Sequence, residues 1–153
     1  MTVPTAKYLV DTNILVYAYD RNGGLKHRRA IEILESLVET EIGALSTQVL
    51  SEFYVVATRK LKTPLDVSAA VESVEYFLTN WTVLNVTPAI VGEALRGVQR
   101  SQLPYWDALI WATAKTNQIP VVLTEDFNTG TSLDGVQMVN PLAQGVDLKG
   151  LSN

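Results

Sequence analysis

Short β-like runs alternate with helical patterns along the whole chain, and this alternation constrains the fold more than any other feature. Apolar or β-branched runs predict strands at Tyr8–Val10, Gly43–Ser46, Thr82–Val86, Val121–Thr124 and Gln137–Val139. Strands alternating with helices favour an α/β fold whose mainly parallel sheet is covered on both faces. We therefore expect a three-layer α/β/α sandwich.

Apolar residues recur at helical spacing between these runs. They predict helices over residues 14–19, about 26–38, 47–61, 64 to about 79, 88 to about 100, and 104 to about 116. Thr63-Pro64 reads as an N-cap followed by a proline at the first helical position, and Thr87-Pro88 repeats that signal. The last helix is apolar almost all round, so we expect it to be central, with Trp106 and Trp111 in the core.

The length fits a single domain. The chain has 153 residues and no convincing linker, repeat or low-complexity tract. We expect one domain over residues 1–153 with a core at about 7–140. Residues 141–153 contain Gly, Pro and Ser without apolar periodicity, which predicts a mobile tail or a surface strap.

Composition excludes several kinds of chemistry. There is no cysteine and one histidine, His27, so disulfides, thiolate metal sites and histidine-rich metal sites are ruled out. The net charge is −4, which argues against a non-specific DNA coat protein. No apolar run reaches the roughly 18–20 residues of a membrane span, and Met1–Ala6 does not resemble a secretory signal. We expect a soluble, cytoplasmic protein.

Four carboxylates stand where ligands bind in parallel sheets, outside the carboxyl ends of the strands. Asp11 and Asp126 follow the first and fourth predicted strands, and Glu52 lies one turn into the helix after the second. A helical wheel places Glu52 at the border of the buried face. Asp107 begins the most apolar helix. All four converge if the chain returns to the upper edge of the sheet around Ser101–Leu103.

Each acid also has an ordinary structural interpretation. Asp11 can cap a helix, and Glu52 can be an ordinary surface residue. Asp107 can be stabilised by the dipole at the start of its helix, and Asp126 can belong to a turn. Glu125 competes with Asp126 for the same role. Two small basic clusters, Lys26/Arg28/Arg29 and Arg59/Lys60/Lys62, could contact phosphates, but we expect them to solvate helix ends.

Crowded carboxylates repel one another, and a hard divalent cation relieves that repulsion. Mg²⁺ prefers oxygen ligands and keeps several of its waters. It reverses the local charge, so that phosphate can approach, and it can supply a hydroxide nucleophile. This chemistry needs neither cysteine nor histidine, which agrees with the composition.

Residues 8–140 resemble a PIN domain, especially the VapC-type toxins of toxin–antitoxin pairs. The resemblance is carried by four short motifs in order, which are Leu9–Asn13, Ser46–Phe53, Tyr105–Ile110 and Leu123–Asp126, and by the ending Val136–Pro141. It implies a PIN-like α/β/α fold and an endoribonuclease that depends on Mg²⁺ or Mn²⁺.

The same resemblance implies roles for individual residues. It assigns catalytic and metal-binding roles to Asp11, Glu52, Asp107 and Asp126, and supporting roles to Asn13 and Thr124. It also implies an RNA substrate, a cognate antitoxin and a homodimer. Our hypothesis is that the metal activates water for in-line attack on an RNA phosphodiester.

Two other functions remain open from the sequence. A PIN-like protein could bind RNA or a partner without cutting. A Mg²⁺-dependent phosphatase could use Asp11 as its nucleophile, although such enzymes carry a second aspartate two residues later, where this chain has Asn13.

Overall fold

A mainly parallel sheet forms the centre of the molecule. The computed structural model describes residues 6–127 and 130–143. Within them the sheet has six strands in the order β3-β2-β1-β4-β6-β5. The strands are β1 (Tyr8–Val10), β2 (Gly43–Ser46), β3 (Thr82–Leu84), β4 (Val121–Leu123), β5 (Ser132–Leu133) and β6 (Val136–Val139). Every neighbouring pair is parallel except β5–β6, a hairpin whose first strand the sequence analysis did not predict.

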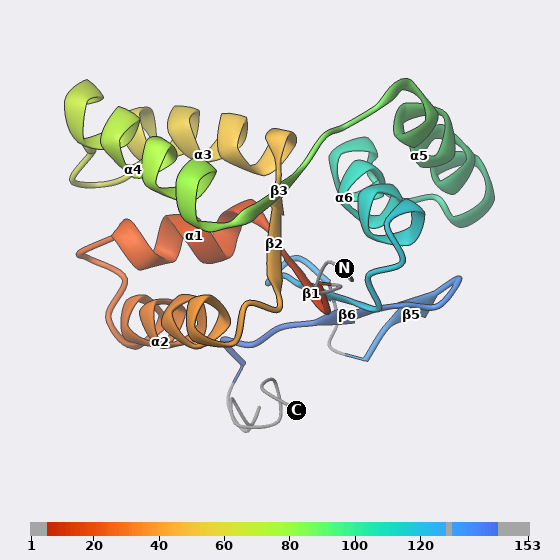
Figure 1. The fold of residues 1–153 in the computed structure, drawn as a ribbon, viewed down its shortest axis with the longest axis horizontal. Helices are drawn as coiled ribbons and strands as arrows, with labels where there is room; N and C mark the ends of the chain where they lie inside the picture. The colour runs from red at the N-terminus through yellow and green to blue at the C-terminus, as the bar shows by residue number, and fades with distance from the viewer. Residues whose placement is uncertain (1–5, 128–129, 144–153) are drawn as a thin grey trace.

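Helices cover both faces of this sheet, as expected for an α/β/α sandwich. They are α1 (Thr12–Tyr19), α2 (Leu25–Thr40), α3 (Thr47–Arg59), α4 (Val67–Asn80), α5 (Pro88–Ser101) and α6 (Tyr105–Thr116). Figure 1 shows α1 to α4 on one side of β2 and β3, and α5 and α6 on the other. The predicted fold class is confirmed.

Side-chain caps fix where several helices begin. Asp11, Ser46 and Thr87 each accept a hydrogen bond from a backbone N–H of the helix that follows. The predicted cap at Thr63 is wrong, because α4 begins at Val67 and Asp66 caps it by accepting from the Ala69 N–H at 2.7 Å. Leu65 explains the difference: its N–H donates to the Ala57 carbonyl at 2.9 Å, which keeps residues 64–66 out of a helix.

Helix α6 is the most buried helix, as its composition predicted. Trp111 is fully buried, and Gly97 of α5 packs so closely on it that a Cβ there would lie 2.7 Å from the Trp111 ring. Trp106, however, is 62% exposed, so the prediction that it belongs to the core is wrong. It lies in the first turn of α6, which reaches the edge of the sheet.

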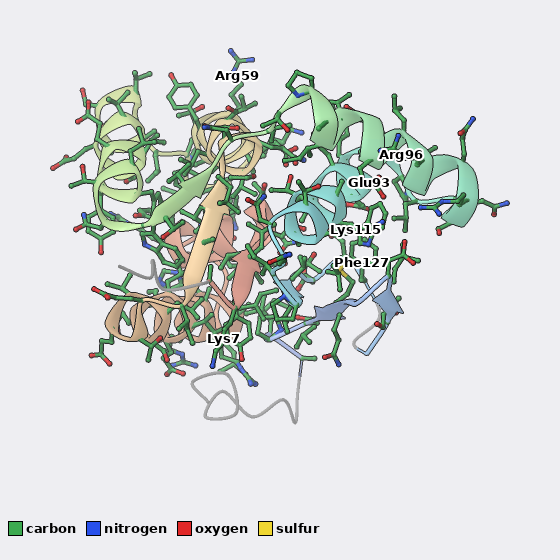
Figure 2. The ribbon with its side chains drawn as sticks, turned by 45° about the vertical axis from the view of Figure 1, so that its right-hand side comes forward. Lys7, Arg59, Glu93, Arg96, Lys115 and Phe127 are labelled. Carbon is green, nitrogen blue, oxygen red and sulfur yellow. The ribbon has the colours of Figure 1, made fainter. Side chains whose placement is uncertain are left out.

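A cluster of ion pairs fastens α5 to α6 on the outer face of the molecule. Glu93 accepts from Lys115 at 2.6 Å and pairs with Arg96 at 2.7 Å, and these contacts lower the pKa of its carboxyl. Figure 2 shows the three side chains gathered on this side. These ion pairs join α5 to α6 and so contribute to the packing of the two helices.

The end of the chain is described only in part. Pro141 and Leu142 are buried against the rest of the fold, and the remainder of the predicted tail, residues 144–153, lies outside the described residues. Over the described ranges, no helix combines the length and the apolar character needed to cross a membrane.

Candidate active site

The strand order places a topological switch point between β1 and β4. From β1 the chain builds β2 and β3 on one side of the sheet, then crosses to build β4, β6 and β5 on the other. The neighbouring strands at such a point leave a crevice outside their carboxyl ends, where ligands bind in α/β proteins. Asp11 follows β1 directly and Thr124 follows β4, so both lie at this crevice.

Asp11 is a buried carboxylate in the centre of the crevice. Only 4% of the residue is exposed. Its Oδ1 accepts from the Thr12 N–H and its Oδ2 from the Thr124 hydroxyl, both at 2.7 Å. Burial nevertheless dominates, and it raises the pKa of Asp11 to about 7, with smaller contributions from the negative charges of Asp126 and Glu52. A positive charge in the crevice would favour its ionised form.

Asn13 and Thr124 connect Asp11 to the segment after β4. The Thr124 hydroxyl also accepts from the Asp126 N–H at 3.1 Å, and the Asn13 amide donates to it at 3.4 Å. The Asn13 carbonyl oxygen accepts from the Glu125 N–H at 3.3 Å. These two residues, which the resemblance marked as supporting, therefore fix the backbone that carries Asp126.

Glu52 enters the crevice from the first half of α3 and is held at both oxygens. The Thr12 hydroxyl and the Gln48 side-chain amide each donate to it at 2.9 Å. The same Gln48 amide donates to the backbone carbonyl of Trp106 at 3.1 Å, which joins the start of α3 to the start of α6. Sequence reasoning missed both donors, although Gln48 stands one helical turn before Glu52, a spacing at which side chains meet.

Asp107 faces the same crevice from the first turn of α6. Burial raises the pKa of its carboxyl, and the charges of Asp126 and Glu52 raise it further. The chain thus does return to the carboxyl edge of the sheet between α5 and α6. All four predicted acids line the same pocket at this edge.

Glu125 is committed to other contacts. The Tyr17 hydroxyl donates to its Oε1 at 2.9 Å, and Lys26 pairs with its Oε2 at 2.7 Å. The Lys26 side chain is 49% exposed, as expected for a solvated helix end, but the sequence analysis did not predict its ion pair with Glu125. These contacts distinguish Glu125 from Asp126, whose side chain accepts no hydrogen bond within the described part of the chain.

The crevice is a pocket of about 950 Å³ with a strong excess of negative charge. Among the described residues its lining holds six carboxylates and one lysine, Lys60; the acids are Asp11, Asp20, Glu52, Asp107, Glu125 and Asp126. Lys26 pairs with Glu125 and Lys60 adds one further ammonium group, but the remaining acids outnumber these cations, so the pocket has the electrostatics of a cation site.

The donor set suits a hard divalent cation, since all the candidate ligands are carboxylate oxygens. As the side chains stand, no three acidic or histidine side chains of the described residues are close enough to hold one ion between them. The arrangement therefore fits an ion held by few carboxylates and completed by water, which is how Mg²⁺ is commonly bound.

The sequence matches the PIN domain family over residues 8–129. This chain belongs to the PIN domain family. The match spans all four acids and both supporting residues. A comparison with curated protein sequences gives no significant match.

Solved structures share the fold of this PIN domain at low identity. VapC20 of Mycobacterium tuberculosis, described as a toxin that cleaves the sarcin–ricin loop, is 20% identical, with 75% of this chain and 86% of that chain covered and a TM-score of 0.63. A chain of a toxin–antitoxin complex from Klebsiella pneumoniae is 22% identical, with 88% of this chain and 97% of that chain covered and a TM-score of 0.65. A chain of FitAB bound to a DNA fragment is 21% identical, with 89% of this chain and 96% of that chain covered and a TM-score of 0.67.

Proposed function

We propose that this PIN domain is a metal-dependent endoribonuclease that hydrolyses RNA phosphodiester bonds. The observation that carries the proposal is the convergence of Asp11, Glu52, Asp107 and Asp126 on one pocket at the switch point of a PIN fold. Uncompensated carboxylates repel a phosphate, so an acidic pocket can serve a nucleic acid only when it also binds cations.

These four carboxylates would hold Mg²⁺ or Mn²⁺, directly or through water. When bound, the ion would supply an activated water for in-line attack and positive charge for the phosphate and the leaving oxygen. The pKa shifts support this assignment, because burial and neighbouring negative charge raise the pKa of both Asp11 and Asp107. A cation would reverse that effect.

The protein's own side chains give the site its shape. Thr124 and Thr12 donate to Asp11 and Glu52, respectively, and so orient the carboxylates that would face the metal. Gln48 holds Glu52 and the start of α6 at a fixed separation. Such outer contacts fix the direction in which ligand lone pairs point, and their loss weakens metal sites.

The biological role we propose is that of the toxin in a toxin–antitoxin pair. The fold is shared with the toxin VapC20, with a protein of the toxin–antitoxin complex from Klebsiella pneumoniae, and with a protein of DNA-bound FitAB. We accordingly propose a cognate antitoxin as partner, a homodimer as the working assembly and the cytoplasm as the location.

Cleavage of a mixed cellular RNA pool tests the activity. Purified protein is incubated with Mg²⁺, Mn²⁺ or a chelator, beside the variants Asp11→Asn and Asp107→Asn. We expect cuts that require metal and vanish in both variants. Metal-independent cutting, or full activity in purified Asp11→Asn, would refute the assignment. Hydrolysis of small phosphomonoesters without RNA cleavage would favour the phosphatase instead.

A further inference from the structure

Trp106 is the most exposed large apolar side chain of the described residues. It is 62% exposed, whereas the other two tryptophans, Trp81 and Trp111, are 9% and 0% exposed. Tryptophan is enriched where proteins contact other molecules, so an exposed ring beside a pocket is a candidate contact residue.

The ring stands at the wall of the acidic pocket. Trp106 is one of the pocket's lining residues and immediately precedes Asp107. Tyr105 contacts it edge to face, with 5.1 Å between ring centroids. The Gln48 side-chain amide donates both to the backbone carbonyl of Trp106 and to Glu52, so the backbone of Trp106 is linked to one of the carboxylates.

The pocket also has a basic side chain available for a phosphate. Lys60 lies at the end of α3, lines the same pocket and forms no ion pair with any part of the chain that the structure describes. The pocket thus has an aromatic face, carboxylates for a cation and an ammonium group. A nucleotide has the matching parts, which are a flat base and a charged phosphate.

We propose that Trp106 is a stacking platform for an unpaired base of the RNA, next to the phosphate that is cut. This inference rests on the proposed function and narrows its substrate class to single-stranded or looped RNA, because a base inside a duplex has no free face. Aromatic side chains commonly hold splayed bases in this way, and the contact tolerates different bases.

Adjacency favours a base over a peptide side chain as the occupant. Trp106 is one residue from Asp107, so whatever covers the ring lies beside the proposed metal site. A nucleotide whose phosphate is bound there would bring its own base to that position, since base and phosphate belong to one unit. The pocket lining also includes apolar side chains such as Val55 and Val86, so it is this adjacency to the carboxylates that favours a base.

Binding of a short fluorescent single-stranded RNA tests the platform. The wild-type protein is the parent, and Ca²⁺ replaces Mg²⁺ so that the cation site can be filled; an unchanged RNA length on a gel confirms that the RNA is not cut. Trp106→Ala should weaken binding by about 10- to 100-fold, the usual effect of losing one stacked base, and Trp106→Phe should bind within a few-fold of the parent. Tyr76→Ala is the matched control, since Tyr76 is 47% exposed and lies outside this pocket.

An abasic scan separates stacking from a structural effect. One abasic nucleotide in the RNA should weaken binding to the parent as much as Trp106→Ala does, with no further loss when both changes are combined. The RNA should also quench tryptophan fluorescence and shield it from acrylamide in the parent but not in Trp106→Phe, because the other tryptophans are buried.

Two results would overturn the inference. One is unchanged RNA binding in Trp106→Ala, including the case in which this variant instead releases a bound protein partner. The other is an abasic scan in which, for every abasic position, the loss of RNA affinity from the abasic nucleotide and the loss from Trp106→Ala multiply when the two changes are combined. If the wild type neither binds RNA nor cuts it with Mg²⁺ or Mn²⁺, the proposed function fails as well. If the wild type cuts RNA and Trp106→Ala cuts it equally, the inference alone fails.

Discussion

The substitution Asp11→Asn should stabilise the protein at pH 8 in the presence of a chelator, although it should abolish RNA cleavage. The natural carboxyl is buried, and burial raises its pKa from 3.8 to about 7. The folded state therefore favours the protonated form. The stability that this group contributes is fully present only below about pH 4 and is lost as the pH rises through about 7.

The size of the effect follows from the pKa values. Each pKa unit corresponds to about 1.4 kcal/mol, so the raised pKa lowers the free energy of unfolding by about 4 kcal/mol at pH 8 and by only about 1–2 kcal/mol at pH 5. Asparagine cannot accept from both Thr12 and Thr124 in the same way, which costs about 1 kcal/mol. The net gain is about 3 kcal/mol at pH 8 and close to zero at pH 5.

Thermal unfolding followed by circular dichroism checks this prediction. A gain of about 3 kcal/mol corresponds to a rise in Tm of roughly 6–12 °C in a domain of this size. Adding Mg²⁺ should raise the Tm of the wild type at pH 8 and leave that of Asp11→Asn unchanged. The reasoning would be refuted if the variant had a lower Tm than the wild type at pH 8, or if the difference in Tm were the same at pH 5 and pH 8.

Three further outcomes are expected. Glu125→Gln should cut RNA within a few-fold of wild type, whereas Asp126→Asn should lose about 100-fold or more in kcat/KM, because Glu125 is engaged by Tyr17 and Lys26; equal losses would contradict this distinction. Gln48→Ala should lower metal affinity about 10-fold with little change in fold, measured by calorimetry, because it frees Glu52. Gly97→Ala should destabilise the protein by about 1–3 kcal/mol through overlap with Trp111, while Gly92→Ala in the same helix should be neutral or stabilising by up to about 1 kcal/mol; denaturant unfolding compares the two.

The sequence pattern was sufficient to predict the elements that position the site. The apolar runs at Tyr8–Val10 and Gly43–Ser46 became β1 and β2 with the predicted bounds. The helical wheel placed Glu52 at the border of the buried face, and its side chain is half-buried. These features depend on the periodicity of apolar residues within a short stretch of sequence, so they can be predicted without knowing the tertiary structure.

What the sequence could not show depends on contacts between distant residues. The cap at Thr63 failed because Leu65 bonds to Ala57 instead, a contact that no capping pattern includes. The ion pair of Lys26 with Glu125 was not predicted, because the two residues lie 99 positions apart in the sequence. Trp106 was assigned to the core because its helix is apolar, and only the tertiary arrangement shows that the first turn of α6 faces the pocket.

Titration with Mn²⁺, read by electron paramagnetic resonance of the free ion, tests the central claim most directly. The claim is that the carboxylates at the switch point bind a divalent cation. Wild-type protein should bind Mn²⁺ saturably, Mg²⁺ should compete, and Asp11→Asn and Asp107→Asn should each lose most of the binding. The account would be contradicted if the wild-type protein left the Mn²⁺ free, or if both variants bound Mn²⁺ as well as the wild type does.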